Sequence, residues 1–217
     1  MSFKDINRIV FALGRKSTTG INLLGTVTLL NKSGLFVTAA HVTGKDDTNL
    51  VIVMKDYSSF YDYQDTSEPA VTAIPVSISA IDPYTDLCIL KSDATAYSNI
   101  LITGSDHVIP GTGMTIFGFP HADHGRLVLT YQRAEVGARV LIAANDQKTK
   151  HLILNTQTRP GQSGSPIFST SDQSLVGILI GSYAPGGGGG ISLGGVDPHT
   201  LHQTTHAVSA EYIKEMI

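Results

Sequence analysis

The chain has 217 residues and a formal net charge of −3, and only 15% of its residues are charged. No basic patch is visible, which argues against nucleic acid or an anionic membrane as a partner. No apolar stretch approaches the ~20 residues that span a bilayer, and the first residues lack the layout of a secretion signal. We therefore expect a cytoplasmic protein.

Short β-branched runs between turns, with 22 glycines and 9 prolines in the chain, predict strands rather than helices. The predicted strands form two groups that meet near residues 94–109. The first group covers residues 9–13, 25–30, 34–38, 50–54, 71–79 and 86–90. The second group covers residues 114–118, 126–132, 138–143, 151–155, 165–168, 175–180 and 205–208. One helix is predicted over 209–217, with Ser209 as N-cap and with Ile213 and Ile217 on one face.

Cys88 is the only cysteine, so the chain cannot form an internal disulfide. It lies inside the apolar run that follows Asp86. We interpret Cys88 as a small buried core residue, because its own motif offers it no base.

The segment Gly161-Gln162-Ser163-Gly164-Ser165-Pro166 combines a serine nucleophile with backbone donors in one short turn. Glycines on both sides allow a tight, open loop that exposes the serine oxygen. The N–H groups of Gly161 and Ser163 are the candidate oxyanion hole. A motif of this type is common by chance, so the prediction needs a base and an acid elsewhere in the chain.

His41 is the candidate base, because it follows an apolar strand pattern and two alanines that leave room for an imidazole. Asp86 is the candidate acid, because its carboxylate opens an apolar run typical of a buried strand. Asp82 is the rival acid, but Pro83 follows it and a turn role explains it.

With these residues in place, the sequence resembles the chymotrypsin-like serine peptidases, and is closer to the bacterial high-temperature-requirement proteases than to the secreted digestive enzymes. The order His41, Asp86, Ser163 is the order of that family's triad, whereas α/β-hydrolases and subtilisins use other orders. The resemblance covers nearly the whole chain. It rests on the segments 38–42, 86–91, 117–120, 160–166 and 175–178.

The resemblance implies an all-β fold of two six-stranded antiparallel Greek-key β-barrels with a C-terminal helix. It implies one peptidase domain over residues 1–217, with barrels at 1–95 and 110–208, a helix at 209–217 and no appended peptide-binding PDZ domain. By the same resemblance, His41 is the general base, Asp86 orients it and Ser163 is the nucleophile. The triad would straddle the cleft between the barrels.

Gln162 departs from the pattern of the secreted enzymes, which place an aspartate before the nucleophile to receive a new N-terminal ammonium. The site should therefore assemble without N-terminal cleavage, or be assembled by a partner that remodels residues 160–162.

The expected substrate-binding residues lie beside Ser163. A peptide should add as a strand along the wall formed by residues 179–182. No acidic residue falls where a trypsin-like pocket would need one, and Leu179 stands where glutamate-selective relatives use histidine. We expect a small or aliphatic residue before the cleaved bond. Arg159 would change this preference only if its side chain reached into the pocket. The predicted substrate-binding residues are Gln157, Thr158, Leu179, Ile180, Gly181 and Ser182.

Two further patterns leave alternatives open. The glycines at 186–190, followed by Gly194 and Gly195, are either a loose connection or a mobile rim of the pocket. The histidines suggest zinc only weakly, because no nearby cysteine or carboxylate completes a set. They are His199, His202 and His206 in one cluster, and His121 and His124 with Asp123 in another.

The sequence thus predicts a serine endopeptidase that needs no cofactor or metal and cleaves a protein or peptide substrate in a regulated way, with an activating partner protein as one option. The alternative is a catalytically silent binding module with the fold of a protease.

Overall fold

The structure is a computed structural model that describes residues 3–144, 147–183 and 204–217. Strands dominate it, as the sequence predicts. The elements in chain order are η1 (Phe3–Arg8), β1 (Val10–Ser17), β2 (Gly20–Leu29), β3 (Leu35–Ala39), α1 (Ala40–Thr43), β4 (Leu50–Met54), β5 (Thr72–Pro75), β6 (Ser77–Asp82), β7 (Leu87–Lys91), β8 (Gly113–Gly118), η2 (Ala122–His124), β9 (Thr130–Ala144), β10 (Gln147–Leu154), β11 (Pro166–Ser169), β12 (Leu175–Tyr183), β13 (Thr204–Ser209), η4 (Ala210–Tyr212) and α2 (Ile213–Met216).

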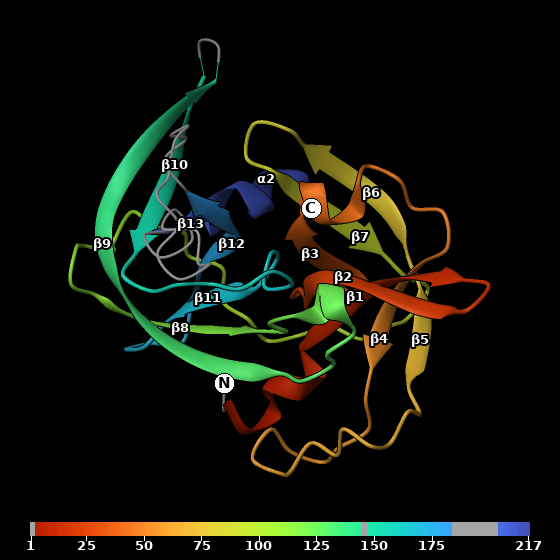
Figure 1. The fold of residues 1–217 in the computed structure, drawn as a ribbon. Helices are drawn as coiled ribbons and strands as arrows, with labels where there is room; N and C mark the ends of the chain where they lie inside the picture. Colours follow the sequence, from red (N-terminus) through yellow and green to blue (C-terminus); the bar gives the residue numbers. More distant parts are fainter. Residues whose placement is uncertain (1–2, 145–146, 184–203) are drawn as a thin grey trace, which may run out of the picture.

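The strands form two antiparallel sheets that lie side by side (Figure 1). The second sheet is a closed six-stranded barrel with the order β10-β13-β12-β11-β8-β9. The first is a seven-stranded sheet with the order β5-β4-β1-β2-β3-β7-β6. The all-β, two-barrel prediction is therefore confirmed, but the first barrel is not closed by hydrogen bonds.

The open edge of the first sheet has a local cause. The predicted strand 71–79 breaks at Pro75, so that β5 pairs with β4 while β6 pairs with β7. At the break, the N–H of Val76 donates to the carbonyl of Leu50 at 3.1 Å. Proline has no N–H to continue a ladder, which explains why one run of apolar residues serves two edges.

In the second sheet, the separate strands predicted over 126–132 and 138–143 are one long strand, β9. Its first half pairs with β8 and its second half with β10. The register shifts where Ala138 and Val136 face consecutive residues of β10, which leaves Gly137 as a bulge. The glycine bends the strand there without ending it.

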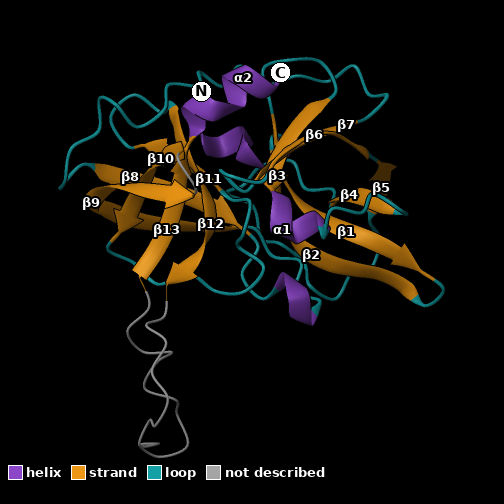
Figure 2. Cartoon of the chain, turned by 90° about the horizontal axis from the view of Figure 1, so that it is seen from above, coloured by secondary structure: helices purple, strands orange, loops and turns teal. Residues whose placement is uncertain are grey.

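The predicted C-terminal helix is shorter and less regular than expected. It is a 3-10 turn, η4, followed by the single turn α2. Ser209 does not cap it, because its hydroxyl accepts from the N–H of Ser105 at 2.9 Å and contacts the Glu211 carboxylate. Ile213 is fully buried, as the pattern predicts. Figure 2 shows α2 at the top of the view, beside the two sheets. Among the described residues, every helix is too short to span a bilayer.

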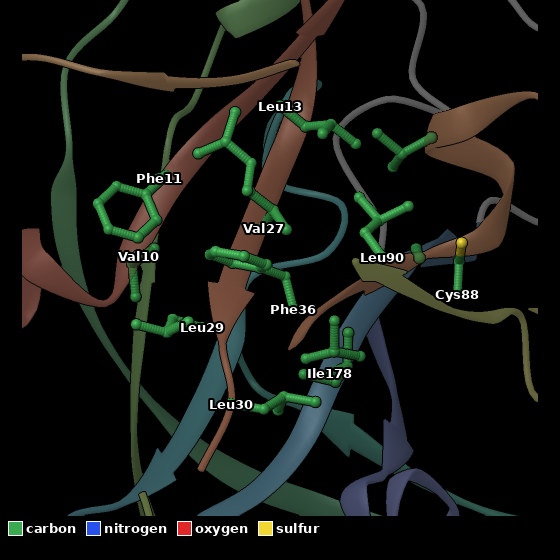
Figure 3. Close-up of a cluster of buried hydrophobic side chains, with 14 of the residues drawn as sticks. Val10, Phe11, Leu13, Val27, Leu29, Leu30, Phe36, Cys88, Leu90 and Ile178 are labelled. Carbon is green, nitrogen blue, oxygen red and sulfur yellow. The ribbon is translucent and has the colours of Figure 1, made fainter. Parts of the chain in front are cut away.

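The largest hydrophobic cluster extends over both sheets, so that they share one core. Figure 3 shows Ile178 of β12 beside side chains of the first sheet. Phe117 of β8 also contacts segments outside the second sheet, because its ring centroid lies 5.0 Å from that of Phe3 in η1 and 5.5 Å from that of Phe60 between β4 and β5. Such tilted and edge contacts between aromatic rings help to hold η1 and the β4–β5 connection against the second sheet.

Candidate active site

His41 and Asp86 meet at one end of the first sheet. β3 ends at Ala39, and His41 follows it in the single turn α1. Asp86 precedes β7 in a left-handed conformation with φ of 57°. Its backbone carbonyl accepts from the N–H of Ala40 at 2.7 Å, which joins the two segments directly.

The Asp86 carboxylate makes two contacts with the histidine. Oδ1 accepts from the backbone N–H of His41 at 2.9 Å, and Oδ2 lies 2.5 Å from Nδ1 of the ring. With the proton on Nδ1, Nε2 is left free to accept another. The rival Asp82 is used differently, because its carboxylate accepts from the N–H of Tyr84 and the hydroxyl of Thr85 in a turn. The structure thus brings Asp86, and not Asp82, to His41.

Ser163 stands on a sharp turn that enters β11. Gly164 has φ of 86°, and a Cβ at this position would lie 2.0 Å from the carbonyl oxygen of Thr26. Only glycine fits such a position. The N–H of Gly164 donates to the carbonyl of Leu179 at 2.8 Å, which ties the turn to β12.

Thr26 of β2 holds this turn against the first sheet. Its N–H donates to the carbonyl of Ser163 at 2.9 Å, and its hydroxyl donates to the carbonyl of Gly161 at 3.1 Å. The same hydroxyl accepts from the N–H of Phe119 at 3.2 Å. Thr26 could not be predicted from the sequence, because nothing in a predicted strand distinguishes a threonine that contacts residues more than 100 positions away.

The backbone of the turn leaves two donors unused. The carbonyl of Pro160 accepts from the N–H of His121 at 2.7 Å, and in a trans peptide the N–H of Gly161 points the opposite way. The N–H of Gln162 donates to the carbonyl of Arg159 at 3.1 Å. Among the described residues, neither Gly161 N–H nor Ser163 N–H has an acceptor. Two free donors on either side of Gln162 are what an oxyanion hole requires.

Gly25 brings the serine turn and the histidine turn to the same point of β2. A Cβ on Gly25 would lie 2.8 Å from Cγ1 of Val42, the neighbour of His41, and 2.9 Å from the carbonyl oxygen of Ser163. The Ser163 hydroxyl makes no hydrogen bond to any residue that the structure describes. Catalytic hydrogen bonds are often long in the absence of substrate.

Gln162 is 1% exposed and occupies the position where the secreted enzymes carry an acid. Its Oε1 accepts from the N–H of Arg159 at 2.7 Å, and its Nε2 donates to Oε1 of Gln132 at 3.2 Å. Gln132 in turn donates to the hydroxyl of Thr156 and to the carbonyl of Gln157. The two glutamines hold residues 156–163 without any charge. Gln132 was not identified from the sequence.

The predicted substrate-binding residues occupy different environments. Thr158 is almost buried, and its hydroxyl accepts from that of Thr205 at 3.3 Å. Leu179 packs inside the second barrel and is 1% exposed, so its side chain belongs to the core. Ile180 is partly exposed at a register shift of β12, where a bulge redirects side chains.

The remaining predicted residues lie on β12 and on the loop that leads to the serine turn. Gly181 pairs with His206, and Ser182 pairs with Thr205 through the backbone of β12. Gln157 is exposed, and the Arg159 guanidinium lies 3.4 Å from its Oε1. Arg159 is thus exposed on the loop.

Cys88 is a buried core residue, as its apolar run predicts. It is fully buried in β7, and burial raises the pKa of its thiol to about 12. A neutral thiol is a poor nucleophile.

The weaker patterns add no site to the described part of the chain. The glycines from 186 to 195, His199 and His202 lie outside the described residues. His124 lies 3.7 Å from Asp123, and no group of three potential metal ligands forms among the residues at 3–144, 147–183 and 204–217.

A closed barrel packed on an open one, with a histidine–aspartate pair on one sheet and a serine turn on the other, defines the chymotrypsin-like fold class. The family description "trypsin-like peptidase domain" matches residues 25–178. The chain belongs to this family, which confirms the resemblance seen in the sequence. A search of curated proteins gives no match.

Solved structures show the same fold at low identity. The MamO protease domain of Magnetospirillum magneticum in its apo form is 16% identical with a TM-score of 0.70, covering 100% of this chain and 99% of that one. The HtrA-type protease AlgW with a decapeptide is 16% identical with a TM-score of 0.66, covering 100% and 66%. The active form of the Rv3671c protease from M. tuberculosis is 12% identical with a TM-score of 0.68, covering 96% and 78%.

Proposed function

We propose that the protein is a serine endopeptidase that hydrolyses peptide bonds through an acyl-enzyme. The observation that carries this proposal is the pair of N–H groups on Gly161 and Ser163 that find no acceptor among the described residues. A fold of this family can be retained without activity, whereas two free backbone donors beside a serine are the groups that would stabilise an oxyanion.

The proposed chemistry follows from these groups. The Ser163 oxygen attacks the carbonyl carbon while Nε2 of His41 takes its proton, and the carbonyl oxygen becomes an anion that the two N–H groups stabilise. The C–N bond then breaks, and His41 gives the proton to the leaving amine. A water molecule repeats the attack with His41 as base, which releases the acid and restores Ser163. Asp86 holds the imidazole and stabilises its charged form through the 2.5 Å contact.

The proposed substrate is a protein or peptide bound in extended form. Beyond Leu179, the only described strand that pairs with β12 is β13, on one side, since its pairing with β11 ends at Ile178. A strand edge of this kind can pair with an added peptide strand. None of the predicted substrate-binding residues that the structure describes carries a charge, which favours a small or aliphatic side chain before the cleaved bond.

We expect regulated cleavage of a partner protein in the cytoplasm, where the single, buried thiol of Cys88 needs no oxidising environment.

The alternative is a silent binding module, and the observation that favours it is the missing hydrogen bond between the Ser163 hydroxyl and His41. In that case, the same strand edge would hold a peptide without cleaving it.

A fluorophosphonate probe distinguishes the two functions, because it reacts only with an activated serine. We expect one adduct in the intact mass of the wild-type protein and none in Ser163→Ala. The matched control Ser171→Ala, at an exposed serine, should keep the adduct. A wild-type protein that binds peptides but gives no adduct would establish the silent module instead.

A further inference from the structure

A cavity outside the proposed active site opens at the unclosed end of the first sheet. Its volume is about 500 Å³, within the range of small-molecule sites. It shares no residue with the serine turn or the histidine–aspartate pair. Its larger apolar lining residues are Phe11, Leu29, Phe36, Ile52, Met54 and Ile74.

This lining is apolar because it is the inner face of a sheet that does not close. Five different strands contribute to it, and Figure 3 shows Phe11 of β1, Leu29 of β2 and Phe36 of β3 as neighbours in the core cluster. Since β5 and β6 do not pair, Met54 and Ile74 remain partly exposed although they pack on the main core. Phe11, Leu29, Phe36 and Ile52 are themselves buried, so the apolar area open to the hollow belongs mainly to Met54 and Ile74.

The mouth of the cavity is polar and carries charges of both signs. Arg8 and Lys55 line it together with one carboxylate, Asp56. Arg8 is exposed and makes no ion pair or hydrogen bond with a residue of the described chain. Lys55 donates to the backbone carbonyl of Asp65. The Asp65 carboxylate lies near Lys55 as well, so Arg8 is the cation of the rim whose side chain has no carboxylate partner among the described residues.

Tyr57 also lines the mouth. Burial raises the pKa of its hydroxyl to about 12, so the group stays neutral near pH 7. It therefore adds no negative charge that would oppose an anion.

We propose that this cavity binds a single-chain amphiphile with a carboxylate head group, a fatty acid, with its chain against the apolar lining and its carboxylate near Arg8. An apolar interior with one charged end matches this class, whereas a sugar or nucleotide would leave its polar groups unpaired against Phe11 and Ile52. The site is independent of the proposed peptidase function.

A chain-length series tests the apolar part of this proposal by calorimetry. Octanoate, decanoate and dodecanoate are titrated into the full chain below their micelle concentrations. Each added methylene that enters the cavity should raise the affinity by roughly fourfold, from its transfer free energy. An affinity that does not change with chain length, or no binding by dodecanoate, would overturn the proposal.

Variants locate the site. Ala94→Phe and Ala96→Phe each place a large ring in the lining, and either should weaken dodecanoate binding by at least about tenfold, because the ring removes the apolar area that the chain would bury. Arg8→Gln should weaken it by roughly threefold at low salt, while Arg133→Gln, at an exposed arginine of β9, should not. Binding that survives both cavity-filling variants would place the ligand elsewhere. Equal binding of dodecanol and dodecanoate would overturn the carboxylate preference.

Discussion

The side-chain amide of Gln162 donates from Nε2 to Oε1 of Gln132 at 3.2 Å, across the gap between the serine turn and β9. Gln132 also contacts Thr156 and Gln157, so one side chain of the barrel holds both ends of the segment that leads to Ser163. This neutral pair stands where an ion pair orders the turn in secreted relatives. We propose that it orders the turn at residues 160–163 without any processing event.

Replacing Gln132 by alanine should lower kcat roughly tenfold while KM changes little, because the free N–H groups would lose their fixed direction. Steady-state kinetics on a peptide substrate measure this. Gln132→Glu keeps an acceptor for Gln162 and should recover part of kcat, and Arg133→Ala is the neutral control. A raised KM with unchanged kcat would instead assign Gln132 to substrate binding.

The sequence was sufficient to predict the candidate site residues that carry a local motif. His41, Asp86 and the serine turn each carry a short motif, and the structure joins His41 to Asp86 as expected. Thr26 and Gln132 could not be found, because their partners are distant in the chain and threonine or glutamine in a strand carries no pattern. The same limit explains the strand errors. The break at Pro75 and the bulge at Gly137 depend on which neighbouring strand each half contacts.

Ser163→Ala and His41→Ala should each remove turnover by on the order of 10⁴-fold, and the double variant should lose little more, because the proposed triad acts as one unit. Single-turnover assays with purified variants measure this. Ser171→Ala controls for the loss of a hydroxyl at the surface. More than a few per cent of activity in either single variant would contradict the mechanism.

Cys88 should be unreactive in the folded protein, since its thiol is buried and its pKa is raised to about 12. A thiol reagent should label it only after unfolding in urea. Cys88→Ala should keep the full kcat and lower the free energy of unfolding by about 1 kcal/mol through lost packing. Rapid labelling of the native protein, or loss of turnover in the variant, would show that the thiol has a chemical role.

His151 should make the protein less stable in mild acid. Burial, with the nearby His206, lowers its pKa to about 4, whereas the unfolded chain titrates near the ordinary value of 6.5. Between these values the unfolded state binds the proton and the folded state does not, so stability falls as pH drops from about 6.5 to about 4. The loss should approach about 3 kcal/mol and then level off.

Urea unfolding at several pH values measures this slope. His151→Gln should flatten the slope between pH 6.5 and 4, while His124→Gln, at an exposed histidine, should leave it unchanged. A His151→Gln profile as steep as that of the wild type would assign the acid sensitivity to other groups.

Activity should not depend on the N-terminus. The polar atoms of the Gln162 side chain are taken by Arg159 and Gln132, and the position carries no carboxylate to receive an ammonium group. The start of the described chain is bound elsewhere, because Phe3 packs on Phe117. A protein with an N-terminal tag should therefore match the untagged chain in kcat/KM, measured on one peptide substrate. Activity that appears only after several N-terminal residues are removed would mean that a new terminus orders the site and that another carboxylate receives it. If both forms are inactive until a partner protein is added, the resting turn at 160–162 is misassembled, and the partner must redirect the N–H of Gly161.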